Sequence, residues 1–232
     1  MKPFANPGLG LGRLIVPDER DRNYPITALT ASPVSSAPAP TTRFWWDQGW
    51  HGNQRSTPHC VAFSFAHWLN DGPHPYSMFD ARRPGVDTTE LYCEAQKRDG
   101  IPGDCSDPQY NGTTLRAGAS VMRAWGHITE YRWAFTLEEV VDWLSRSGTI
   151  VAGTWWYESM FYPDADGMVG IAGHAVGGHA YLLHGVDTEA EVVRFKNSWG
   201  RYWGRDGNAY MTFETLQQLM SRSGEMCIPI AS

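Results

Sequence analysis

The segment NQRSTPHCVAFSFAHWL, residues 53–69, joins a polar turn to an apolar run with helical spacing. Thr57 is a good N-cap, and Pro58 suits the first helical position because the N–H that proline lacks would be unpaired there. The segment therefore predicts a helix that ends at Asn70-Asp71-Gly72-Pro73. Its buried face is formed by apolar residues at helical intervals, namely Val61, Phe65, Trp68 and Leu69.

The predicted helix places Cys60 in its first turn, where the free N–H groups and the helix dipole favour negative charge. A thiolate is stabilised there, and the thiolate is the nucleophilic form of cysteine. The Cys60 amide and the Gln54 side chain, six residues earlier, are candidate donors to an oxyanion. Taken alone, Cys60 also fits a buried core thiol, which is where most free cysteines lie.

A second informative region runs from GGHAYLLHGVD, residues 177–187, into FKNSWGRYWGRDGNAY, residues 195–210. Two short strands separated by a turn predict a hairpin, with His179 at the start of one strand and Asn197 at the end of the other. An imidazole needs a neighbour that fixes its tautomer, and an asparagine carbonyl can do this. Trp199 can cover the hydrogen bond between them. A thiolate–imidazolium pair is the expected active form.

His174 and His184 flank His179, and both are expected to be surface or loop histidines. Their spacing does not fit a helical zinc site, and the chain has no Cys-x-x-Cys pair. Asp164 and Asp166 lack a glutamate at the offset of a helix-loop-helix calcium site. We therefore expect neither a metal nor another cofactor.

These motifs resemble the papain family of cysteine peptidases. That family has a glutamine six residues before the catalytic cysteine, a Cys-aromatic-Ala-Phe-Ser run, a later His-Ala pair, Lys-Asn-Ser-Trp-Gly and a second Trp-Gly. The corresponding residues are Gln54, Cys60–Ser64, His179-Ala180, Lys196–Gly200 and Trp203-Gly204. The resemblance covers roughly residues 43–215 and is closer to bacterial or phage-type members.

The resemblance implies a role for each matching residue. Cys60 is the nucleophile, His179 the general base and acid, and Asn197 the group that orients the histidine. Gln54 forms the oxyanion hole with the Cys60 amide. The implied activity is hydrolysis of peptide bonds through a thioester, with a peptide or protein as substrate.

The positions beside the catalytic residues are expected to contact the substrate: Gly177, Gly178, Ala180 and Trp199. Two alternatives remain. An amidase, transamidase or peptide ligase would use the same triad, since amines and water attack the same thioester. A peptide-binding module without catalysis is usually marked by loss of the Cys, His or Asn, and all three are present here.

The chain departs from the family pattern beside the nucleophile. Thr57 stands where the family usually has a second cysteine, Pro58-His59 replaces Gly-Ser, and Val61 replaces an aromatic residue. His59 is therefore a second titrating group next to Cys60, or a residue that occludes the cleft.

The fold class implied by the resemblance is α+β, with a papain-like two-lobe arrangement and the active-site cleft between the lobes. The N-terminal helical lobe covers about 58–147 and the C-terminal antiparallel β-rich lobe about 148–222, within a domain at 43–232. Helix N-caps are expected at Asp87, Thr113 and Thr136, where Thr136-x-x-Glu139 has the pattern of a capping box. Strands are expected at 149–156, 180–187, 192–197 and 208–213, before a short helix at 214–221.

Residues 1–42 are rich in Pro, Gly, Ser, Ala and Thr and predict an extended arm, with SPVSSAPAP (32–40) as a linker. The arm lacks the long amphipathic helix of a typical inhibitory propeptide, so we expect it to pack on the surface of the domain. The Gly-rich residues 157–178 predict a flexible loop or a lid at the edge of the cleft.

The composition limits the class of partner. A formal charge of −6 argues against nucleic acid or an anionic membrane, and no apolar run reaches the ~20 residues that span a bilayer. No secretory signal pattern is visible, which predicts a cytoplasmic protein or one secreted after removal of an unseen signal. Cys93 and Cys105 fit either a disulfide or reduced thiols. Oligomeric state stays open.

Overall fold

The structure is a computed structural model that describes residues 7–29, 41–44, 50–71, 85–103, 105–106 and 111–231. The linker predicted at 32–40 lies outside these residues, as do Gly72 and Pro73 of the predicted helix end.

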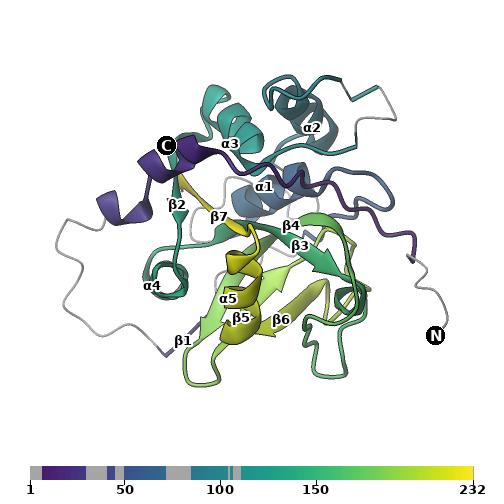
Figure 1. The fold of residues 1–232 in the computed structure, drawn as a ribbon, viewed down its shortest axis with the longest axis vertical. Coiled ribbons are helices and arrows are strands. Elements are labelled where there is room, and N and C mark those ends of the chain that lie inside the picture. Colours follow the sequence, from purple (N-terminus) through teal and green to yellow (C-terminus); the bar gives the residue numbers. More distant parts are fainter. Residues whose placement is uncertain are drawn as a thin grey trace.

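One antiparallel sheet forms the centre of the molecule (Figure 1). Its order is β2-β7-β3-β4-β5-β6, and β1 pairs with the end of β4. The strands are β1 (Thr42–Phe44), β2 (Ile128–Ala134), β3 (Ile150–Tyr157), β4 (Ala175–Asp187), β5 (Val192–Lys196), β6 (Asn208–Thr212) and β7 (Glu225–Ala231). The α+β class is confirmed. The sequence patterns did not predict β1, β2 or β7, and β4 begins earlier than expected.

In the described part of the chain, five α-helices pack around this sheet (Figure 1). They are α1 (Cys60–Asn70), α2 (Thr88–Gln96), α3 (Leu115–Ala124), α4 (Leu137–Arg146) and α5 (Phe213–Ser221). The Thr136 capping box before α4 is confirmed, and Asp87 caps α2 by accepting from the amides of Thr89 and Glu90. No helix in the described residues is long and apolar enough to cross a bilayer.

Two predicted helix starts were wrong. The N-cap of α1 is His59 rather than Thr57, because the Thr57 hydroxyl instead donates to the Gln54 carbonyl at 2.6 Å. The N-cap of α3 is Thr114, whose side chain accepts from the Ala117 amide. Thr113 lies one residue earlier, and its main chain pairs with the N-terminal arm.

Residues 157–178 are not one continuous flexible loop. A short 3-10 helix occupies Glu158–Phe161, and β4 already begins at Ala175. The Ser159 hydroxyl donates to the Gly170 carbonyl at 2.5 Å and joins the two sides of the segment. This segment is therefore held at its base by hydrogen bonds.

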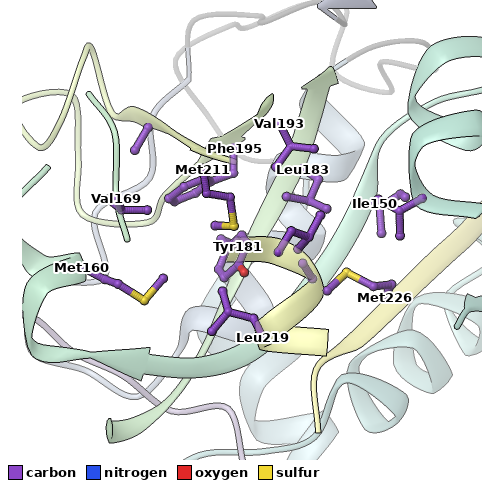
Figure 2. Close-up of a cluster of buried hydrophobic side chains, with 14 of the residues drawn as sticks. Ile150, Met160, Val169, Tyr181, Leu183, Val193, Phe195, Met211, Leu219 and Met226 are labelled. Atoms are coloured by element: carbon purple, nitrogen blue, oxygen red, sulfur yellow. The ribbon is translucent and has the colours of Figure 1, made fainter. Parts of the chain in front are cut away.

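The two faces of the sheet bury two different hydrophobic clusters. Successive side chains of a strand point to opposite faces. Tyr181 and Leu183 of β4 enter the cluster beneath α4 and α5 (Figure 2), whereas Ala180 and Leu182 enter the cluster with α1, α2 and α3. Cys60 belongs to the second cluster.

A buried ion pair joins the helices to the sheet. Lys196 at the end of β5 contacts both carboxylate oxygens of Asp71, the C-cap of α1, at 2.8 and 3.0 Å, and both side chains have no exposed area. The Lys196 ammonium also donates to the Trp50 carbonyl at 3.2 Å. The pair fixes the C-terminal end of α1 against β5.

The N-terminal arm, the purple segment that crosses α1 in the view of Figure 1, bonds to Gly178 of β4 and to Thr113 just before α3. It continues into short 3-10 helices at Glu19–Asn23 and Ile26–Ala28. Buried Asp21 pairs there with Arg116 of α3, and the Trp133 amide of β2 donates to the Tyr24 carbonyl. The arm is thus fixed at its far end by α3 and β2.

Candidate active site

Cys60 is the first residue of α1 and has no exposed area. Its sulfur takes part in hydrogen bonds with backbone groups of Ala180, Val61 and Arg13. The cysteine therefore lies at the start of the helix, against β4 and directly beside the residue that follows His179.

His179 lies within β4, and its Nε2 atom is 2.8 Å from Oδ1 of Asn197, which directly follows β5. The Trp199 ring stacks on the imidazole, with ring centroids 4.7 Å apart and planes 22° apart. Trp156 meets it edge-on at 4.8 Å. Nδ1 of His179 is buried and has no hydrogen-bond partner among the described residues. The ring is therefore held through one nitrogen while the other stays available.

Gln54 is buried beside the same loop. Its backbone N–H donates to the Ser198 carbonyl at 2.8 Å, and its side-chain Oε1 accepts from the Ser198 hydroxyl. Nε2 donates to the Thr57 carbonyl at 2.6 Å. These bonds tie Gln54 to the residue that follows Asn197 and hold its carboxamide close to the start of α1.

The arm passes directly over these residues. The Gly10 carbonyl accepts from Nε1 of Trp199 at 2.9 Å, and the amides of Gly12 and Arg13 both donate to the Gly178 carbonyl at 3.1 Å. A Cβ atom on Gly12 would lie 2.1 Å from the Pro58 carbonyl oxygen, so only glycine permits this approach. The arm therefore covers Cys60, which explains the absence of exposed area on the thiol.

Main-chain pairing continues on the helical side of the arm. The Thr113 amide donates to the Gly12 carbonyl, and the Leu14 amide donates to the Thr113 carbonyl, both at 2.9 Å, in a parallel arrangement. The Leu11 side chain lies over Gly177. A groove of about 500 Å³ follows the arm and is also lined by Pro58.

The electrostatics of the covered site differ from the expected ion pair. Burial raises the pKa of the Cys60 thiol to about 12, and the backbone hydrogen bonds offset this only in part. Burial lowers the pKa of His179 to about 4, against the effect of the Asn197 hydrogen bond. Near neutral pH both groups are therefore uncharged beneath the arm, because neither charge is solvated there.

The two flanking histidines have different environments. His174 is exposed, as expected. The prediction for His184 was wrong: it is buried in β4, and its Nε2 lies 2.9 Å from Oδ1 of Asn208. His59 packs against the Tyr92 ring, with centroids 4.1 Å apart, and burial lowers its pKa.

The remaining cysteines and acidic residues form no further reactive cluster in the part of the chain that the structure describes. Cys93 and Cys105 form a disulfide, and Cys227 is a buried free thiol. Among the described residues no group of three or more His, Cys, Asp or Glu side chains could hold a metal ion.

The sequence patterns missed the arm residues of the site. Gly10, Gly12, Arg13 and Leu14 form main-chain bonds with residues on both sides of Cys60. The sequence signal that could have indicated these residues is the alternation of glycine in GLGLG, residues 8–12. A main chain with glycine at every second position is narrow enough to lie between Gly178 on one side and Thr113 on the other.

Comparison with known proteins identifies the fold. The sequence matches no protein-family profile and no curated protein. The structure is similar to xylellain, a cysteine protease from Xylella fastidiosa, with a TM-score of 0.72 and 18% identity over 100% of this chain and 99% of that one. It is also similar to proCathepsin B S9 from Trypanosoma congolense, with a TM-score of 0.69 and 13% identity over 100% and 89% of the two chains.

A third similar structure is the digestive procathepsin L2 proteinase from the larval midgut of Tenebrio molitor, with a TM-score of 0.65 and 17% identity over 96% of this chain and 78% of that one. Identities this low carry the fold and no more. The fold of this chain is that of the papain-like cysteine proteases.

Proposed function

We propose that this chain is a cysteine peptidase that hydrolyses peptide bonds with Cys60, His179 and Asn197. The observation that carries the proposal is the arrangement of His179. Asn197 holds Nε2 at 2.8 Å, Trp199 covers the ring, and Nδ1 is left without a partner beside the strand position that contacts Cys60.

The reaction follows from this arrangement. When the site is open, His179 takes the thiol proton, and the Cys60 sulfur attacks the carbonyl carbon of the substrate. The imidazolium returns the proton to the leaving amine, which departs and leaves a thioester. Water, deprotonated by His179, then attacks the thioester; the C–S bond breaks, the acid is released, and the imidazolium returns its proton to the Cys60 sulfur. The Cys60 amide and the Gln54 carboxamide stabilise the oxyanion formed in both steps.

The contacts of the arm support a peptide substrate. Gly178 and Thr113 offer main-chain groups, and Trp199 offers its indole N–H, to an extended chain that lies over Cys60. These groups would serve the main chain of any peptide in the same place. The predicted substrate contacts of Gly177, Gly178, Ala180 and Trp199 are part of the proposal, as is a closer relation to bacterial or phage-type members.

A peptidyl epoxide that alkylates activated thiols tests the proposal. Intact mass would be followed for the wild type, for Cys60→Ala, and for a full-length Gly10→Ala/Gly12→Ala chain. The added methyl groups would lie 2.1 Å from the carbonyl oxygens of Thr57 and Pro58, so we expect them to push the arm off Cys60. Gly170→Ala is the control, because no atom lies within 4 Å of its Cβ position and its φ lies outside the left-handed region.

We expect one adduct on the double glycine variant, formed at least ~10-fold faster than on the wild type and on Gly170→Ala, and none on variants that also carry Cys60→Ala. The opened variant should also cleave peptides. An opened chain whose Cys60 reacts no faster than free cysteine at pH 6 would contradict the proposal.

A further inference from the structure

The two sides of the cleft that hold the arm are built differently. Gly178 belongs to β4, and its pairing with Trp155 of β3 fixes its carbonyl in the sheet. Thr113 lies outside the helices and strands, yet its amide and its carbonyl both bond to the arm at 2.9 Å. A main chain that binds a partner without a sheet behind it needs other groups to hold it in place.

Those groups come from α2. The Gly112 amide donates to the Tyr92 hydroxyl at 3.0 Å, and the Gly112 carbonyl accepts from Nε2 of Gln96, also at 3.0 Å. Nε2 of Gln96 donates in addition to the Tyr92 hydroxyl at 2.9 Å. Both main-chain polar groups of Gly112, the residue before Thr113, are therefore held by side chains of one helix.

The conformation of Gly112 explains why it needs this support. Its φ of 126° favours glycine, and a Cβ atom here would lie 2.5 Å from the Gly12 carbonyl oxygen. Glycine permits the close approach of the arm, but its main chain is the least restricted of all residues. The hydrogen bonds to Tyr92 and Gln96 supply the rigidity that glycine lacks.

The ring of Tyr92 faces the nucleophile end of the site. It packs on the imidazole of His59, with centroids 4.1 Å apart, and His59 immediately precedes Cys60. Burial raises the pKa of Tyr92, and a negative charge on Cys60 would raise it further, so the hydroxyl is neutral near pH 7. Tyr92 is 2% exposed and thus joins Gly112, through its hydroxyl, to the residue before the nucleophile, through its ring.

We propose that Tyr92 is a positioning residue, which holds the Thr113 main chain where the main chain of an extended substrate pairs with it. This inference rests on the proposed peptidase function. Once the arm is displaced, a peptide over Cys60 would use the same N–H and C=O of Thr113. Their direction depends on the Gly112 peptide group, so Tyr92 acts on the substrate through Gly112 rather than on the reacting atoms.

Amide hydrogen exchange of the full-length chain, followed by NMR, tests the proposal without catalysis. The four amides that join the arm to the cleft form two pairs. The helix-side amides are those of Thr113 and Leu14, which bond Thr113 to the arm, and the sheet-side amides are those of Gly12 and Arg13, which donate to Gly178. The arm is thus its own internal reference.

Tyr92→Phe removes the hydroxyl and keeps the ring on His59. The matched control is Tyr157→Phe. Tyr157 is 8% exposed, and its hydroxyl accepts from Nη1 of Arg222 at 2.8 Å, so this variant loses a hydrogen bond that does not involve Gly112.

We expect the helix-side amides to exchange at least ~10-fold faster in Tyr92→Phe, because the Gly112 peptide group loses the partner that fixes it. The sheet-side amides should change less than about twofold, because β4 still holds them. Tyr157→Phe should leave both pairs within about twofold of the wild type. Unchanged helix-side exchange in Tyr92→Phe, or an equal rise in both pairs, would overturn the proposal.

Peptide hydrolysis by the Gly10→Ala/Gly12→Ala chain gives the second measurement. Adding Tyr92→Phe should raise KM at least ~10-fold and change kcat less than about twofold, because the weakened pairing holds the substrate equally before and during the reaction. Adding Tyr157→Phe should leave both constants unchanged. A fall in kcat with KM unchanged would overturn the positioning role. If the opened chain hydrolyses nothing, the proposed peptidase function fails, and hydrogen exchange still decides whether Tyr92 holds the Thr113 main chain.

Discussion

Strand β4 carries two buried histidines with nearly the same partner. Nε2 of His179 lies 2.8 Å from Oδ1 of Asn197, and Nε2 of His184 lies 2.9 Å from Oδ1 of Asn208. The difference lies around the pairs. His179 stacks on Trp199 and lies beside the residue that contacts Cys60, whereas the amide of Asn208 donates to the Asp206 carbonyl and holds a turn. A His–Asn pair is therefore not in itself a sign of catalysis.

The largest expected difference between the two histidines is in the effect of replacing each one by alanine. In the Gly10→Ala/Gly12→Ala background, His179→Ala should slow peptide hydrolysis by at least ~10³-fold, since the general base and acid is lost. His184→Ala should keep the activity and lower the free energy of unfolding by about 2 kcal/mol, because buried Asn208 loses its partner. Turnover and urea unfolding would be measured on both. Equal loss of activity would show that His184 also acts in the reaction.

The dependence of stability on pH gives the next largest effect. Burial lowers the pKa of His179 from 6.5 to about 4, so the unfolded chain binds more protons than the folded one between these values. The contribution of His179 to stability is therefore complete above pH 6.5 and is lost as the pH falls towards 4, by about 3 kcal/mol.

His179→Gln should remove this part of the slope when urea unfolding is compared between pH 4 and 8. His184→Gln is the matched substitution on the same strand, and the His179 contribution should persist in it. A His179→Gln curve parallel to that of the wild type would show that His179 is already solvated in the folded chain.

The two asparagines give the smallest effect. Asn197→Ala should reduce peptide hydrolysis in the opened background roughly tenfold to a hundredfold, because the imidazole loses its fixed orientation. Asn208→Ala should leave hydrolysis within about twofold and lower the Tm, since it also releases the turn at Asp206. The rate of Cys60 alkylation against pH checks the first effect, and thermal unfolding the second.

Features fixed by neighbouring residues could be predicted from the sequence. The apolar spacing of residues 61–69 and the Thr136-x-x-Glu139 pattern indicated α1 and α4, and the hairpin of β4 and β5 followed from alternation and a turn. Helix starts were less reliable, because Thr57 and Thr113 are both good caps whose hydrogen bonds go elsewhere in the fold.

Features fixed by distant residues could not be predicted. β7 lies between β2 and β3 in the sheet. The element that precedes it in the chain, α5, gives no indication of that position. The contact of Arg13 with Glu225 joins opposite ends of the chain, and a glycine-rich arm has no periodicity that points to a cleft. The pKa values of Cys60 and His179 are shifted because the arm buries both groups. The position of Cys60 at a helix start therefore predicted a thiolate–imidazolium pair where both groups are uncharged.

The buried ion pair of Lys196 and Asp71 controls the position of the proposed nucleophile from the opposite end of α1. α1 has Cys60 at one end and Asp71 just beyond the other, about 16 Å away along the helix, and Lys196 immediately precedes Asn197. A small rotation at the fastened end would therefore move the sulfur relative to the imidazole. Substitutions at this remote pair would act as a fine adjustment of reactivity, without touching either reacting group.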